Sequence, residues 1–204
     1  MPDKRIYLAS RSPRRRELLR QIGVSFELLL LREDARRGRD VDETAGEAET
    51  ASDYVMRIAR SKAEVAARQA LQRGLRPHPA LGADTTVVLD GNVIGKPENA
   101  EHAADILAAL SGREHEVMTG VALALRDRVE SALSVSSVEF RALSALEIQR
   151  YIASGEPFGK AGAYAIQGRA AAFITRIAGS YSGIMGLPLA ETAQLLRKFD
   201  IETV

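Results

Sequence analysis

The segment "SPRRRELL" (12–19) combines a helix start with side chains that bind phosphate. Ser12 suits an N-cap, and Pro13 suits the first helical position. Arg14, Arg15 and the arginine after them then crowd cations at the positive end of the helix, where cations are mildly unfavourable. A bound polyanion would reverse this effect, because helix-end N–H groups and arginines both donate to phosphate. The alternative is three solvated arginines on a surface helix.

Two lysines are further candidates for an anion site. Lys62 follows Val55, Ile58 and Ala59 at helical spacing, so we expect it on the apolar face of its helix. A lysine there is either a functional cation facing a cleft or a side chain that reaches out to solvent. Lys96 ends a strand in "GNVIGKP", where it either meets an anion or lies on the surface. This segment is not a P-loop, because its spacing is one residue short and a proline replaces the required Ser or Thr.

Asp84 is the carboxylate whose surroundings favour chemistry, since it lies just inside an apolar strand. Such a group is a hydrogen-bonded structural residue, a general base or a metal ligand. The loop "EPFGKAGAYAIQG" (156–168) adds Gln167, whose amide suits a base edge, and Tyr164, which stacks, hydrogen-bonds or is buried. These groups together suit a phosphorylated small molecule, and a metal between carboxylate and phosphate would complete the charge balance.

The composition argues against several classes of protein. A net charge of +1 over 204 residues provides no field that attracts nucleic acid. The absence of cysteine excludes disulfides, thiolate nucleophiles and cysteine zinc sites. The first ten residues lack the apolar core of a signal peptide, and no apolar run approaches the roughly 20 residues of a membrane span. We therefore expect a cytoplasmic protein with neither nucleic acid nor membrane as a partner.

Strand and helix patterns alternate along the chain, which predicts an α/β fold with a mixed rather than a purely parallel sheet. The run "SFELLLL" is typical of a buried strand, and Asp90–Gly91 between apolar runs predicts a hairpin. Residues 32–51 lack periodicity and predict a solvated loop. Strands are predicted over 5–10, 25–31, both arms of 80–97, 114–126, 129–141 and 171–179, and helices over 12–23, 52–74, 99–112, 144–155 and 187–199.

Several of these segments, in order along nearly the whole chain, resemble the Maf family of nucleotide pyrophosphatases, also called septum-formation-inhibitor-like proteins. The matching segments are "LASRSPRRRELL" (8–19), "ARSKA" (59–63), "LGADTTVVLDGNVIGKP" (81–97), "LSGREHEVMTGVAL" (110–123), "EPFGKAGAYAIQG" (156–168) and "GSYSGIMGLPL" (179–189).

The resemblance implies one domain over 1–204, with an elongated twisted mixed sheet flanked by helices and two lobes around a central cleft, as in ITPase-like folds. It implies hydrolysis of a nucleoside triphosphate to the monophosphate and pyrophosphate, with Mg²⁺ or Mn²⁺, by a homodimer. The family roles carried over are Asp84 as catalytic base and metal contact, Arg14, Thr85 and Gln167 as base-selecting residues, and Ser10, Ser12, Arg15, Lys62 and Lys96 along the phosphate path, with Lys160 as a further candidate.

The end of the 156–168 loop indicates the substrate branch. Members that resemble 7-methyl-GTP pyrophosphatases tend to carry "EG" there, whereas "GAYAIQG" looks like the dTTP/UTP branch. Gln167 would pair with the O4 and N3–H edge shared by thymine and uracil, while a glutamate cannot donate to O4. The alternatives are a pyrophosphatase for 7-methyl-GTP or another non-standard nucleotide, and a non-enzymatic regulator of septum formation.

The chain departs from the family pattern at two places. Many members carry an acidic pair after the second strand, and in "LREDARRGRD" either Glu33 or Asp34 is expected to match it. Arg11 stands where small residues are common, and the sequence offers no account of it.

Overall fold

A computed structural model describes residues 5–32, 38 and 40–203 of the chain. Within this part, seven strands form one mixed sheet in the order β2-β1-β3-β5-β6-β7, with β4 beside β3. Strand β1 runs parallel to β2 and β3, and the remaining pairs are antiparallel. The mixed α/β sheet is therefore confirmed. The strands are β1 (Arg5–Leu8), β2 (Ser25–Leu28), β3 (Ala80–Leu89), β4 (Asn92–Ile94), β5 (Glu114–Leu125), β6 (Arg128–Phe140) and β7 (Ile174–Ala178).

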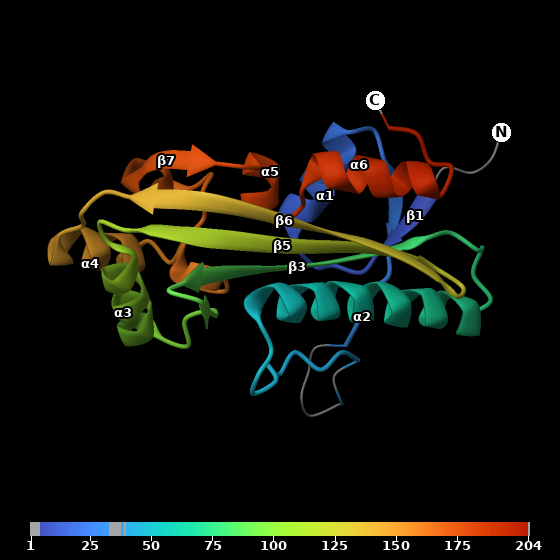
Figure 1. Ribbon diagram of the computed structural model, residues 1–204, viewed down its shortest axis with the longest axis horizontal. Coiled ribbons are helices and arrows are strands. Elements are labelled where there is room, and N and C mark those ends of the chain that lie inside the picture. The colour runs from blue at the N-terminus through green and yellow to red at the C-terminus, as the bar shows by residue number, and fades with distance from the viewer. Residues whose placement is uncertain (1–4, 33–37, 39, 204) are drawn as a thin grey trace.

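Helices lie on both faces of the sheet and at one end of it (Figure 1). The long helix α2 runs along one face, and α1 and α6 lie on the other. Polar side chains begin several of these helices, including the predicted capping box of Ser144 and Glu147. The helices are α1 (Pro13–Gln21), α2 (Ala51–Gln72), α3 (Ala100–Leu110), α4 (Ala145–Ala153), α5 (Tyr181–Ile184) and α6 (Leu189–Lys198), with 3₁₀ turns η2 (Ala161–Ala163) and η3 (Arg169–Phe173).

Two glycines let α2 lie unusually close to the sheet. A Cβ atom on Gly82 of β3 would lie 2.5 Å from the backbone oxygen of Ala59 and the backbone nitrogen of Ala63. A Cβ atom on Gly120 of β5 would lie 2.8 Å from the backbone oxygen of Val55. Only glycine fits at such distances, so these two positions set the depth at which α2 packs.

The opposite face of the sheet packs against α1 and α6. Leu18 and Leu19 of α1 are buried with Leu81 of β3, Leu123 of β5 and Leu196 of α6. Burial of this apolar stripe fixes the direction of α1, because a short helix gains most of its stability from packing. The first turn of α1, which carries the arginines, consequently lies beside the middle of β3.

The edge of β3 that faces β1 has a gap in its strand pairing. Strand β1 pairs with Ala80 and Leu81, and β4 pairs with residues 87–89. Within the described part of the chain, residues 82–86 have no strand partner on this edge, although β5 pairs with them on the other. Successive side chains of a strand point to opposite faces. The gap therefore lets Asp84, on the α2 face, and Thr85, on the α1 face, reach one opening.

Two sequence predictions about strands are corrected here. The run "SFELLLL" is not a buried strand, because β2 ends at Leu28 and lies at the edge of the sheet, where Leu28 and Leu30 are exposed. The strand predicted over 171–179 begins only at Ile174, since the residues before it form η3.

The single domain over 1–204 and the two lobes around a central cleft stay predictions. Among the residues described, none of the helices combines the length and the apolar composition needed to cross a membrane.

Candidate active site

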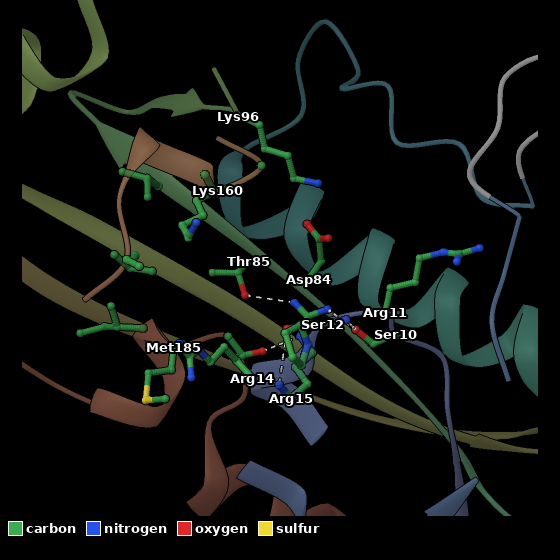
Figure 2. A pocket seen from close by; sticks show the side chains of 18 of the residues that line it. Ser10, Arg11, Ser12, Arg14, Arg15, Asp84, Thr85, Lys96, Lys160 and Met185 are labelled. Carbon is green, nitrogen blue, oxygen red and sulfur yellow. Dashed lines mark hydrogen bonds between the residues drawn. The ribbon is translucent and has the colours of Figure 1, made fainter. Parts of the chain in front are cut away.

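A cavity of about 870 Å³ opens at the gap beside β3. Figure 2 shows side chains from α1, from β3 and from the segment after β4 around it. The catalytic and substrate-binding candidates named from the sequence, together with Lys160, line this cavity, although the segments that carry them are far apart along the chain. These residues are Ser10, Ser12, Arg14, Arg15, Lys62, Asp84, Thr85, Lys96, Lys160 and Gln167.

Lys62 joins two carboxylates on the α2 side of the cavity. Its Nζ atom lies 2.8 Å from Oδ1 of Asp84 and 2.7 Å from Oε1 of Glu43. The side chains of Lys62 and Asp84 are 15% and 17% exposed, so this pair is largely shielded but still reaches the cavity. Of the two alternatives for Lys62, the structure favours the paired cation facing the cavity over a side chain that extends into solvent.

Arg15 is bound to the protein on nearly all sides. Its Nε atom donates to the carbonyl oxygen of Gly186 at 2.7 Å, and its Nη1 atom donates to the carbonyl of Ala83 and to Oγ of Ser10. Its Nη2 atom donates to Oγ1 of Thr85 at 3.3 Å. Burial lowers the pKa of Arg15, and the charges of Asp84 and Glu43 act in the opposite direction. The guanidinium thus ties α1 to β3 and to the segment after α5.

The other groups of the first turn differ in their surroundings. Ser12 is the N-cap of α1, and its hydroxyl accepts from the backbone N–H of Arg15. Its own N–H donates to Oγ of Ser10. Arg14 is exposed at the rim of the cavity and pairs with Glu17 at 2.9 Å. The three arginines are therefore not equivalent, because Arg15 is committed to protein acceptors while Arg14 faces the opening.

Glu156 holds the loop that carries Gln167. Its carboxylate accepts hydrogen bonds from the Tyr151 hydroxyl and from the backbone N–H groups of Arg169 and Ala170. Burial alone would raise the pKa of Glu156, but these hydrogen bonds outweigh burial and leave it below its usual value. A Cβ atom on Gly168 would lie 2.2 Å from Oε1 of Glu156, so the glycine admits the carboxylate.

Lys96 follows β4, and Lys160 belongs to the loop that carries Gln167; the two segments are neighbours. The backbone N–H of Gly162 donates to the carbonyl of Gly95, which places the loop beside Lys96. The ammonium of Lys160 donates to the backbone carbonyl of Glu156. Lys96 is exposed, and Figure 2 shows its side chain reaching into the cavity toward Asp84.

Tyr164 lines the cavity as a largely buried side chain rather than stacking across it. Its hydroxyl is 2.9 Å from Nε2 of His115, and both residues pack edge-on against Phe140. Burial lowers the pKa of His115 to about 4, so the ring is neutral at pH 7. Of the alternatives for Tyr164, the buried, hydrogen-bonded one is observed.

Two acidic residues at the cavity were not predicted from the sequence. Glu33 and Asp34, the positions expected to match the family acidic pair, lie outside the described residues. Glu43 brings its carboxylate to Lys62 instead. The sequence feature that could have indicated Glu43 is the acidic pair Asp42–Glu43, which ends seven residues before the α2 N-cap at Thr50. Glu156 was overlooked because its role depends on backbone groups of a distant turn.

The carboxylates fit a divalent metal shared with a substrate. Mg²⁺ in phosphate sites is usually held by one or two carboxylates together with phosphate oxygens. Asp84 and Glu43 supply such a pair on either side of Lys62. The described residues contain no group of three or more His, Cys, Asp or Glu that could hold a metal by themselves. The donor set therefore suits a metal that substrate phosphates help to hold.

The chain matches a known protein family and several named proteins along nearly its whole length. The family model for the Maf-like protein matches residues 5–199. A dTTP/UTP pyrophosphatase from Aromatoleum aromaticum is 59% identical over 196 residues, which cover 96% of this chain and 95% of that one. The corresponding protein from Nitrosomonas europaea is 56% identical with the same coverage. Among solved structures, a HAM1 protein from Coxiella burnetii shares 21% identity and a TM-score of 0.44 over 67% of this chain and 72% of that chain.

Proposed function

Because the chain belongs to the Maf-like protein family, we propose that it hydrolyses dTTP and UTP to the monophosphate and pyrophosphate, as a housecleaning enzyme of nucleotide pools. The observation that carries the proposal is the pairing of Asp84 with Lys62 at a cavity lined by further cations. A general base beside positive charge suits attack of water on a phosphoric anhydride.

In the proposed reaction, Asp84 orients a water molecule and takes a proton from it. The water oxygen forms a bond to the α-phosphorus, the bond from that phosphorus to the bridging oxygen breaks, and pyrophosphate leaves with the electron pair. Lys62, held 2.8 Å from Asp84, keeps this carboxylate in place. Negative charge grows on the leaving group, which Lys96 stabilises from the rim.

A divalent cation, Mg²⁺ or Mn²⁺, is part of the proposal. Asp84 and Glu43 would hold it, and the ion would supply positive charge to the phosphate oxygens. Lys62 contacts both carboxylates, so it limits their mutual repulsion when no cation lies between them.

Base selection is assigned to the other side of the cavity. Gln167 carries an amide that donates to O4 and accepts from N3–H, which thymine and uracil both present. Thr85 faces the same cavity from the α1 side of β3, and Arg14 lies at its rim. The proposal also includes a homodimer acting in the cytoplasm, which size-exclusion chromatography and cell fractionation would test.

The experiment is a pyrophosphate-release assay with Mg²⁺ or Mn²⁺ on dTTP, UTP, CTP, GTP and 7-methyl-GTP. We expect release from dTTP and UTP, and a loss of about 10²–10⁴-fold in Asp84→Asn. Asp90→Asn is the matched control, because this carboxylate is 65% exposed at the turn that ends β3. Release from 7-methyl-GTP alone would overturn the substrate assignment. No release from any nucleotide by folded protein would overturn the enzyme and favour the regulator of septum formation.

A further inference from the structure

We propose that Thr119, a residue buried beneath the cavity, is a positioning residue for base selection that sets the hydrogen-bond polarity of Thr85. This inference rests on the proposed function, because it concerns how that site distinguishes one pyrimidine from another. Thr119 has no exposed surface and is absent from the cavity lining. Its effect on a nucleotide must therefore pass through a neighbour.

The register of the sheet places the two threonines directly opposite each other. Thr85 of β3 pairs with Thr119 of β5 in the antiparallel ladder. Residues paired in this way have side chains on the same face of the sheet. The Oγ1 atom of Thr119 lies 3.0 Å from Oγ1 of Thr85 and 2.8 Å from the carbonyl oxygen of Gly183 in α5. A carbonyl only accepts, so the single hydrogen of Thr119 goes to Gly183, and Thr119 accepts the hydrogen of the Thr85 hydroxyl.

Thr85 receives a hydrogen bond from Arg15. The Nη2 atom of Arg15 donates to Oγ1 of Thr85 at 3.3 Å, as Figure 2 shows. A guanidinium has five N–H groups and no acceptor, so the direction of this bond is fixed. The other bonds of Arg15 to Gly186, Ala83 and Ser10 hold the guanidinium in place.

These two bonds determine what Thr85 offers to a ligand. A hydroxyl group has one hydrogen and two acceptor lone pairs. Thr119 takes the hydrogen and Arg15 takes one lone pair, which leaves the second lone pair of Thr85 to accept from the cavity. A fixed acceptor favours an N–H group, such as N3–H of uracil and thymine, which Thr85 would share with the oxygen of Gln167. It disfavours the unprotonated N3 that cytosine carries at the same ring position, because two acceptors would then face each other.

Removing the Thr119 hydroxyl should therefore change selectivity more than rate. In Thr119→Val, the hydrogen of the Thr85 hydroxyl loses its acceptor, so the hydroxyl rotates and donates to N3 of cytosine. We expect the ratio of kcat/KM for UTP to that for CTP to fall by about tenfold, the size of one hydrogen bond. Thr119→Ser keeps the hydroxyl and should retain the wild-type ratio. Thr192→Val is the matched control, since Thr192 is equally buried and donates to the carbonyl of Pro188, and neither residue lines the cavity.

A double-mutant cycle tests whether Thr119 acts through Thr85. The variants are Thr119→Val, Thr85→Val and the two combined, each assayed for pyrophosphate release from UTP and CTP. The inference predicts that Thr119→Val has no further effect on the UTP-to-CTP ratio once Thr85 is valine. An additive effect, or an unchanged ratio in folded Thr119→Val, overturns the inference. Failure of the wild-type protein to act on UTP would instead overturn the proposed function, so the two failures are distinguishable.

Discussion

The Nζ atom of Lys62 lies 2.8 Å from the Oδ1 atom of Asp84, across the contact between α2 and β3. This contact depends on how deeply α2 packs, because the two residues come from different layers. Gly82, two residues before Asp84, is the point where the helix backbone approaches the strand most closely. The candidate base and its cation are thus positioned by the same packing that holds the layers together.

Lys62→Met should reduce kcat/KM for UTP by about 10²-fold, because it removes the ion pair that holds Asp84 in place. It also leaves the Asp84 and Glu43 carboxylates without their shared cation. Steady-state pyrophosphate release measures the effect. Lys198→Met is the control, since that lysine is half exposed and pairs with Glu130 elsewhere. Equal activity of both variants would contradict the role given to Lys62.

Gly120→Ala should lower the free energy of unfolding by about 1–3 kcal/mol, because its Cβ would lie 2.8 Å from the Val55 carbonyl oxygen and force α2 outward. Gly95→Ala provides the comparison, as a Cβ there meets no atom within 4 Å. Urea unfolding of both variants gives the difference. A Gly120→Ala protein as stable as Gly95→Ala would show that α2 does not depend on this close approach.

His115 should make stability depend on pH between about 6.5 and 4, since burial lowers its pKa from 6.5 to about 4. The folded state favours the neutral ring, so this contribution is complete above pH 6.5 and is lost as pH falls toward 4. At pH 5 the loss is about 2 kcal/mol relative to pH 7.5.

Urea unfolding of wild type and His115→Gln at pH 7.5 and pH 5 measures this contribution. Glutamine does not titrate and still offers a hydrogen bond to Tyr164. The wild type should lose more stability than His115→Gln on going to pH 5, and His102→Gln, a change at an exposed histidine, should behave like wild type. Parallel losses in wild type and His115→Gln would rule out His115 as the source.

Glu156→Ala should raise KM for UTP and loosen the turn that follows Gln167, because the N–H groups of Arg169 and Ala170 lose their acceptor. Amide hydrogen exchange at these two residues reports the turn directly. Glu156→Gln should recover much of the protection, since its oxygen accepts from the backbone and its amide donates to Tyr151. Unchanged exchange in Glu156→Ala would mean that the turn is held by other contacts.

Much of the fold follows from local patterns in the sequence. The Asp90–Gly91 turn has both residues at positive φ, as the hairpin signal predicts, and the Ser144 capping box is present. The prediction of a buried strand for the run "SFELLLL" is wrong, because an apolar run does not reveal whether its strand lies at the centre or the edge of a sheet.

The site was predictable where side chains carry distinctive chemistry, as Asp84 and Lys62 do. Glu43 was not, because the segment 32–51, which is rich in charged residues and lacks periodicity, gives no local indication of which carboxylate folds back onto α2. Thr119 carries no sequence signal at all. Its importance depends on a cross-strand register and on the direction of a hydrogen bond, and both are properties of the tertiary structure.

The gap on the edge of β3 gives adjacent residues of one strand two separate tasks. Asp84 belongs to the layer that contains α2, and Thr85 belongs to the layer that contains α1 and α5. Substitutions in the α1 and α5 layer could therefore redirect the protein toward other bases during evolution or in the laboratory. Asp84, the proposed base, would remain untouched on the other face of the same strand.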